Sequence, residues 1–140
     1  MKIKLLDNSF VTITDDMDRD KIGNILSNIK DDVAEIEMVN ELDMRLFDTY
    51  NFLGLKNLSK VTVNENVNIM PPLRFKKYEV PIVTLIIKGK TFRPNSIFNG
   101  EYHNLYQLVY VENDSLAMQY QNWLEENDFA SQVRVIGNNY

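Results

Sequence analysis

Apolar and polar residues alternate over the first 14 positions of the chain. Ile3 and Leu5 alternate with lysines, and Val11 and Ile13 follow a polar segment at residues 7–9. Alternation with a period of two is typical of strands, and a short polar break between two such runs indicates a hairpin. The pattern therefore predicts two short paired strands at the start of the chain.

The pattern changes to helical spacing between residues 16 and 30. Apolar side chains recur there at intervals of three and four residues, at Ile22, Ile25, Leu26 and Ile29. This spacing predicts one amphipathic helix. Its expected N-cap is Asp15 or Asp16, and Asp18 and Asp20 would then lie near the positive end of the helix dipole.

The centre of the chain contains a repeated pattern of strand-like segments. Each segment has the form apolar-x-x-apolar-x-apolar-x, and the three clear copies begin at Leu58, Ile82 and Leu105. A weaker copy begins at Val33, so all four starting positions are almost evenly spaced. A repeat this short cannot bury its own apolar residues, so the copies are expected to stack around a common core.

Stacking the copies in register predicts which side chains point inward. Two interior columns are expected, one formed by Ile36, Val61, Leu85 and Leu108 and the other by Met38, Val63, Ile87 and Tyr110. Phe75 and Phe98 each precede the first apolar position of the next copy by seven residues. We expect both rings to fill the far side of the core.

The residues between the core positions are expected to form an outward-facing sheet surface, because successive side chains of a strand point to opposite faces. This candidate binding surface comprises Lys60, Thr62, Asn64, Thr84, Ile86, Lys88, Gln107, Val109 and Val111. Ile86, Val109 and Val111 would form an exposed aliphatic patch, unless the N-terminal hairpin or another loop covers it. Contiguous exposed apolar surface with a charged rim is typical of a protein-binding site.

The last part of the chain predicts a terminal cap for the array. Residues 115–127 carry Leu116, Tyr120, Trp123 and Leu124 at helical spacing. N-cap candidates lie at residues 113–115, and Val133 and Val135 predict a final strand. The ends of a stacked array must differ from its middle, since an open apolar end would otherwise be exposed. The helix at 16–30 would cover the other end.

Two repeat copies carry the pattern N-L-x-x-[IV]-x-[IV] or a close variant, at Asn57-Leu58-Ser-Lys-Val61-Thr-Val63 and Asn104-Leu105-Tyr-Gln-Leu108-Val-Tyr110. Over roughly residues 33–136 the chain resembles the BspA-like leucine-rich repeats of the bacterial surface-antigen type. The resemblance implies an α/β fold, a short leucine-rich-repeat solenoid of three to four repeats, each of about 23–25 residues. It would have an N-terminal hairpin–helix cap at 1–32 and a solenoid with a C-terminal helix–strand cap at 33–140, in one compact domain.

The amino-acid composition excludes several kinds of catalytic and metal site. The 140 residues contain no Cys and one His, at position 103, so disulfides, thiolate metal sites and Cys nucleophiles are excluded. No phosphate-binding glycine motif and no hydrolase nucleophile motif occurs in the sequence. We therefore expect no catalytic residues, no metal, no cofactor and no small-molecule substrate, and predict that the protein is not an enzyme.

The hydropathy of the chain indicates where in the cell the protein is expected. The chain has no apolar run long enough to span a membrane, and the N-terminal residues lack the apolar core of a secretory signal. The expectation is a protein that does not insert into membranes and is not secreted by a signal peptide, and that is cytoplasmic in the producing cell or associated with a virion. Abundant Asn, Ile and Lys are typical of an AT-rich bacterial or phage genome.

The net charge of −5 is distributed unevenly along the chain. Residues 1–50 carry 12 acids and 6 bases, residues 51–100 carry 2 and 8, and residues 101–140 carry 6 and 1. Such asymmetry can steer association with a charged partner or a second copy. The basic middle segment is interleaved with aromatic residues, but the acidic pI of about 4.9 opposes a nucleic-acid partner.

These features favour a non-enzymatic module for protein–protein binding or assembly, which holds a protein partner or another copy of itself. Its expected setting is a phage particle, as a structural or accessory protein. The alternative is a small acidic intracellular inhibitor or immunity protein that binds a host or toxin protein. That alternative would use an acidic surface formed by Asp18, Asp20, Glu35 and Glu37.

Overall fold

A computed structural model describes residues 1–14, 16–40, 55–67, 83–98 and 106–137. The strands are β1 (Lys2–Leu5), β2 (Phe10–Thr12), β3 (Val33–Met38), β4 (Lys60–Val63), β5 (Val83–Ile87), β6 (Tyr106–Val111) and β7 (Gln132–Val135). The helices within these ranges are α1 (Arg19–Ile29), the single turn α3 (Pro94–Ile97) and α4 (Asp114–Glu126). The predicted α/β class is confirmed.

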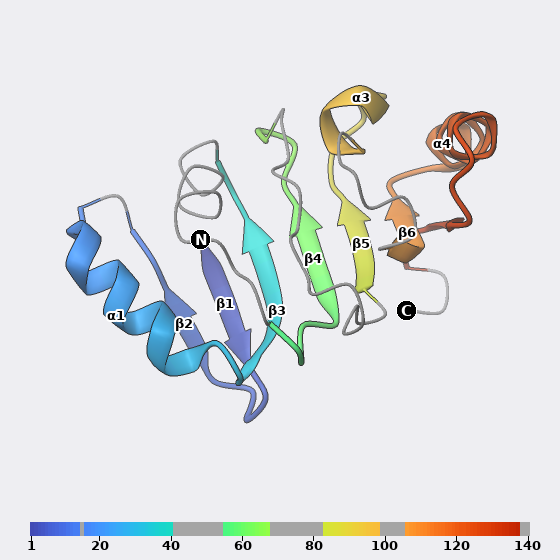
Figure 1. The fold of residues 1–140 in the computed structure, drawn as a ribbon. Helices are drawn as coiled ribbons and strands as arrows, with labels where there is room; N and C mark the ends of the chain where they lie inside the picture. Colours follow the sequence, from blue (N-terminus) through green and yellow to red (C-terminus); the bar gives the residue numbers. More distant parts are fainter. Residues whose placement is uncertain (15, 41–54, 68–82, 99–105, 138–140) are drawn as a thin grey trace.

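All of these strands belong to one seven-stranded sheet with the order β2-β1-β3-β4-β5-β6-β7 (Figure 1). The strands from β3 to β7 lie side by side in chain order, and each pairs in parallel with the next. β1 pairs antiparallel with both β2 and β3, so the N-terminal hairpin extends the parallel part of the sheet at one end.

The N-terminal hairpin forms where the alternating pattern predicted it. The turn is closed by the Asp7 carboxylate, which accepts a hydrogen bond of 2.9 Å from the Ser9 backbone N–H. Asn8 adopts a φ of 71°, a left-handed conformation that Asn tolerates better than most residues. The hairpin places Ile3 in the core and turns Lys2 and Lys4 to the opposite face of the sheet.

Helix α1 is confirmed, but its predicted N-cap is wrong. The helix begins at Arg19, and the Asp18 carboxylate caps it by accepting a hydrogen bond of 2.7 Å from the Lys21 N–H. Asp16 instead accepts a hydrogen bond from the Thr14 hydroxyl, which keeps it in the preceding turn. Asp15 lies outside the described residues. The apolar stripe predicted for this helix buries Ile22 and Leu26 against the sheet.

The pairing of the parallel strands agrees with the predicted repeat, except at one position. Lys60 lies opposite Glu35 and Thr84 lies opposite Lys60, as the alignment of the repeat copies predicted. The exception lies between β5 and β6. Thr84 of β5 lies opposite Leu108 of β6, whereas the sequence pattern aligned Thr84 with Gln107. A register irregularity next to Thr84 adds one residue to the β6 side, so the spacing from β5 to β6 is longer by that residue than the pattern indicated.

This single-residue shift overturns the predicted inward positions of β6. Val109 and Val111 occupy the interior columns and are fully buried, while Leu108 and Tyr110 point to the other face. The physical reason is the two-residue period of a strand, because a slip of one residue moves every side chain to the opposite face. The other columns are as predicted, with Val61 and Val63 facing Leu85 and Ile87.

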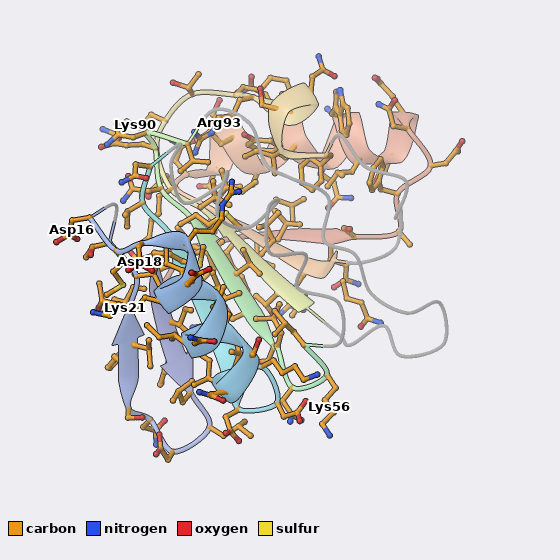
Figure 2. All side chains as sticks on the ribbon, turned by 60° about the vertical axis from the view of Figure 1, so that its left-hand side comes forward. Asp16, Asp18, Lys21, Lys56, Lys90 and Arg93 are labelled. Carbon is orange, nitrogen blue, oxygen red and sulfur yellow. The ribbon has the colours of Figure 1, made fainter. Side chains whose placement is uncertain are left out.

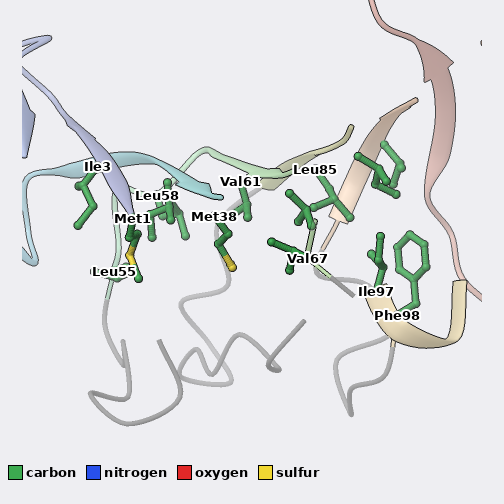
Figure 3. Packing of buried hydrophobic residues seen from close by; sticks show 14 of the residues in the cluster. Met1, Ile3, Met38, Leu55, Leu58, Val61, Val67, Leu85, Ile97 and Phe98 are labelled. Atoms are coloured by element: carbon green, nitrogen blue, oxygen red, sulfur yellow. The ribbon is translucent and has the colours of Figure 1, made fainter. Parts of the chain in front are cut away.

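One hydrophobic cluster extends along the sheet from Met1 to Leu124. Figure 3 shows part of it, with side chains such as Val61 and Leu85 projecting from the strands on the side of the sheet where Ile97 and Phe98 lie. Phe98 is buried as predicted, and its ring stacks on Trp123 at 5.7 Å between centroids. Phe75 lies outside the described residues.

The C-terminal helix and strand form as predicted. Asn113 caps α4 by accepting a hydrogen bond of 2.9 Å from the Leu116 N–H. The helix buries Leu116, Tyr120 and Leu124, and β7 follows as the outermost parallel strand.

Candidate functional site on the outer face of the sheet

The two faces of the sheet differ in what covers them. The core face contacts α1, α3 and α4, each of which contributes buried residues to the hydrophobic cluster. The opposite face, called the outer face below, carries no helix among the described residues. Its side chains, from the β2 end to the β7 end, are Phe10, Thr12, Lys2, Lys4, Glu35, Glu37, Lys60, Thr62, Thr84, Ile86, Leu108, Tyr110, Gln132 and Arg134.

A three-residue ion-pair network crosses the first strands of the outer face. The Glu35 carboxylate lies between two lysines, with its Oε2 at 3.1 Å from Lys4 Nζ and its Oε1 at 2.9 Å from Lys60 Nζ. The strand register produces this arrangement, because Lys4 and Lys60 are the direct neighbours of Glu35 on β1 and β4. Opposite charges in direct cross-strand positions stabilise the pairing of their strands.

The network fixes the charge of Glu35. Partial burial alone would raise the pKa of this carboxyl group, but hydrogen bonds and positive charge from Lys60 and Lys4 outweigh that effect. The pKa of Glu35 consequently lies below its ordinary value of 4.5. Glu35 is therefore ionised and neutralised by its neighbours at physiological pH.

A hollow of about 240 Å³ lies next to this network on the outer face. The residues that surround it are mostly charged or polar and come from four adjacent strands: Lys2, Lys4, Phe10, Glu35, Ile36, Glu37, Lys60 and Thr62. Lys2 Nζ lies 4.5 Å from the centroid of the Phe10 ring, a cation–π contact. Phe10 itself is 57% exposed, which makes it one of the most exposed large apolar side chains described. The hollow thus combines an accessible aromatic ring with charges of both signs.

The aliphatic patch predicted on this surface does not exist. Val109 and Val111 lie on the core face because of the register shift in β6. Ile86 does point to the outer face, but only 4% of it is exposed, and it lies opposite the equally buried Tyr110 of β6. The N-terminal hairpin does not cover Ile86, since β3 and β4 lie between the hairpin and β5 in the sheet.

The remaining predicted surface residues fall into two groups. Lys60, Thr62 and Thr84 lie on the outer face as expected, each partly exposed. Asn64 and Lys88 lie just beyond the ends of β4 and β5, where both of their backbone carbonyls accept hydrogen bonds from Arg93. Gln107 is exposed at the irregular start of β6.

The predicted acidic surface is divided by the sheet. Asp18 and Asp20 belong to the start of α1, which packs on the core face, and Figure 2 shows Asp18 beside Asp16 and Lys21 there. Glu35 and Glu37 point to the outer face instead. The four carboxylates therefore do not form one continuous patch.

Arg93 has a structural role that the sequence did not reveal. Its guanidinium donates hydrogen bonds to four backbone carbonyls, those of Asn64, Glu65, Val67 and Lys88. These carbonyls lie in the turns that follow β4 and β5, so Arg93 ties two consecutive turns together. Its own backbone N–H donates to the Tyr120 hydroxyl at 3.0 Å. In the sequence, Arg93 is recognisable only as a basic residue before a proline. That signal does not identify its carbonyl partners, which lie in a turn one repeat earlier in the chain.

Burial isolates Tyr120 from solvent. The desolvation raises the pKa of its hydroxyl group above the usual value of 10.0, although Arg93 acts in the opposite direction. Its ring also meets Phe92 edge-on at 4.8 Å between centroids. Tyr120 thus links α4 to the segment before α3.

No group of three or more metal-binding side chains comes together in the described part of the chain. None of the helices described there is long and apolar enough to cross a bilayer. No protein-family model, no curated protein and no solved structure matches this chain.

Proposed function

We propose that this protein is a non-enzymatic protein-binding module, built as a short leucine-rich-repeat-like solenoid whose outer sheet face meets its partner. The solenoid interpretation is supported by the parallel strands from β3 to β7, which follow one another in chain order at a nearly constant spacing along the sequence. It is also supported by the hydrophobic cluster of described residues that continues across the strands.

The observation that carries the proposal is the composition of the outer face around the hollow. Accessible Phe10 and Thr62 lie there beside the charged groups of Lys2 and Glu37. Protein-binding surfaces combine an aromatic anchor with a charged and polar rim in this way. The hollow is open to solvent and is bordered by several strands. Such a shape suits a folded partner protein or an extended peptide segment better than a small substrate.

The phage setting rests on sequence resemblance and composition, and it stays a prediction. The acidic-inhibitor alternative draws less support from the geometry. Glu35 is already neutralised by Lys4 and Lys60, and Asp18 lies on the other side of the sheet. We therefore favour the outer face over a combined acidic surface as the proposed partner site.

The proposal is tested with Thr62→Arg, which places a bulky charge in the hollow. The matched control is Asn122→Arg, which adds the same side chain at an exposed position on α4, away from the outer face. Both variants and the wild type are used as bait in lysates of the producing cells, and captured proteins are identified by mass spectrometry. We expect a partner that the wild type and the control capture and that Thr62→Arg loses. Equal capture by Thr62→Arg would contradict the proposal, provided that its thermal unfolding matches that of the control.

A further inference from the structure

Among the described residues, no strand pairs with the edge of β2 that faces away from β1. In the β1–β2 hairpin, Met1 and Ile13 exchange backbone hydrogen bonds, and Leu5 donates to Ser9. Hydrogen-bonded pairs alternate along an antiparallel ladder, so the backbone groups of Phe10 and Thr12 point away from β1. Neither residue makes a hydrogen bond to any other element in the part of the chain that the structure describes. The edge thus presents two N–H and two C=O groups.

Within the part of the chain that the structure describes, this edge lacks the features that usually prevent strand addition. Natural sheet edges are protected by lysine, proline, bulges or a covering segment. The β2 sequence is Phe-Val-Thr, without charge or proline, and its pairing with β1 shows no irregularity. Both Phe10 and Thr12 are exposed.

The opposite edge of the sheet is protected. At β7, the Gln121 side chain from α4 accepts a hydrogen bond of 2.9 Å from the Val133 N–H and donates one of 3.4 Å to the Ser131 carbonyl. This carboxamide occupies the position that a peptide group of a further strand would take. β7 also carries the exposed charge of Arg134. As far as the described residues show, strand addition is therefore blocked at the β7 edge and open at the β2 edge.

From this asymmetry we infer that a second copy of the chain pairs with the β2 edge, strand to strand and antiparallel, about a two-fold axis at Val11. With Val11 opposite its counterpart, Phe10 of each copy lies opposite Thr12 of the other. This register satisfies all four outward groups of each edge, and a one-residue displacement would leave some of them unpaired. This inference rests on the sheet edge and not on the proposed function, although the edge and the proposed partner surface share Phe10.

The asymmetric edges also limit the size of the assembly. A two-fold contact uses the same edge on both copies and closes, so the product is a dimer and not a filament. The short β2 strand of each copy buries less surface than stable dimers require, even with the exposed Phe10 ring included. The dimer is consequently expected to be weak, with a dissociation constant in the micromolar range or above.

The first test uses Thr12→Pro, which removes only the outward N–H, a substitution that edge strands tolerate. Thr12→Val keeps the N–H and is the control. Light scattering across a concentration series should give a mass that rises toward that of a dimer for the wild type and Thr12→Val. Two hydrogen bonds are lost per dimer in Thr12→Pro, which should raise the dissociation constant at least about ten-fold. A wild type that stays monomeric, or a Thr12→Pro protein that dimerises equally well, would overturn the inference.

A second test does not depend on how Thr12→Pro folds. The chain contains no Cys, so Val11→Cys supplies a single thiol at the proposed axis. Directly opposed residues in a non-hydrogen-bonded pair lie about 4.5 Å apart between Cα atoms, within the range that a disulfide bridges. Thr12→Cys is the control, because two residues related by this axis would be too far apart. Mild oxidation should link Val11→Cys into dimers and leave Thr12→Cys monomeric, and equal linking of the two would contradict the register.

Discussion

Glu35 is the residue at which charge and fold are most closely connected. Because its folded pKa lies below 4.5, the Lys4–Glu35–Lys60 network stabilises the folded state at neutral pH. This contribution is lost as the pH falls below about 4.5 and through the lower folded pKa, where the carboxylate takes up a proton. It is no larger than about 1 kcal/mol, since the lysine ends are about one third exposed and water screens them.

We predict that Glu35→Gln lowers the free energy of unfolding at pH 7 and that its deficit relative to the wild type shrinks as the pH falls below about 4.5. Urea unfolding followed by circular dichroism at several pH values measures this difference. Glu37→Gln is the control: Lys2 lies opposite Glu37 on β1 and Thr62 on β4, but within the described residues Glu37 forms no ion pair. A Glu35→Gln deficit that is constant with pH would show that the network does not stabilise the fold through its charge.

Single-residue roles were only partly accessible from sequence. The inward positions of β3, β4 and β5 followed from their alternation, since Ile36, Val61 and Leu85 are all buried. Arg93 and Gln121 could not be assigned, because their hydrogen bonds go to backbone atoms that only the tertiary structure brings near. Such contacts leave no periodic signal in the chain.

At the scale of elements, α4 does more than cover the end of the core. Its Gln121 side chain substitutes for a neighbouring strand at β7. We predict that Gln121→Ala exposes the Val133 N–H and accelerates its hydrogen exchange at least about ten-fold, because a peptide N–H without a partner exchanges far more readily. Nuclear magnetic resonance resolves this single amide. Gln119→Ala, which removes contacts only to Ser115, should leave it unchanged.

Elements were predicted well where their pattern was long and regular. The segments of α1 and α4 were identified by their apolar stripes, whereas the start of α1 was misplaced because several aspartates compete for the cap position. The error in β6 has a different cause. The repeat pattern fits β6 equally well whether Leu108 and Tyr110 or Val109 and Val111 point inward. A bulge of one residue therefore cannot be detected from the pattern.

At the scale of the whole molecule, the register of the parallel strands decides which residues form the core face and which form the outer face. The proposed partner surface depends on this assignment, as does the correction at Val109 and Val111. The α/β class and the approximate repeat period followed from the sequence. The absence of an exposed aliphatic patch did not, because it depends on the bulge before Leu108 and on the burial of Ile86.

Disulfide formation between β5 and β6 tests this register most directly, since the chain has no Cys of its own. The register places Thr84 opposite Leu108, at a Cα separation that a disulfide can span. The double variant Thr84→Cys/Leu108→Cys should oxidise rapidly within the folded chain, as measured by mass spectrometry of linked peptides. Thr84→Cys/Gln107→Cys should oxidise far more slowly. Faster oxidation of the second pair would restore the alignment that the sequence pattern predicted, return Val109 and Val111 to the outer face, and contradict the account.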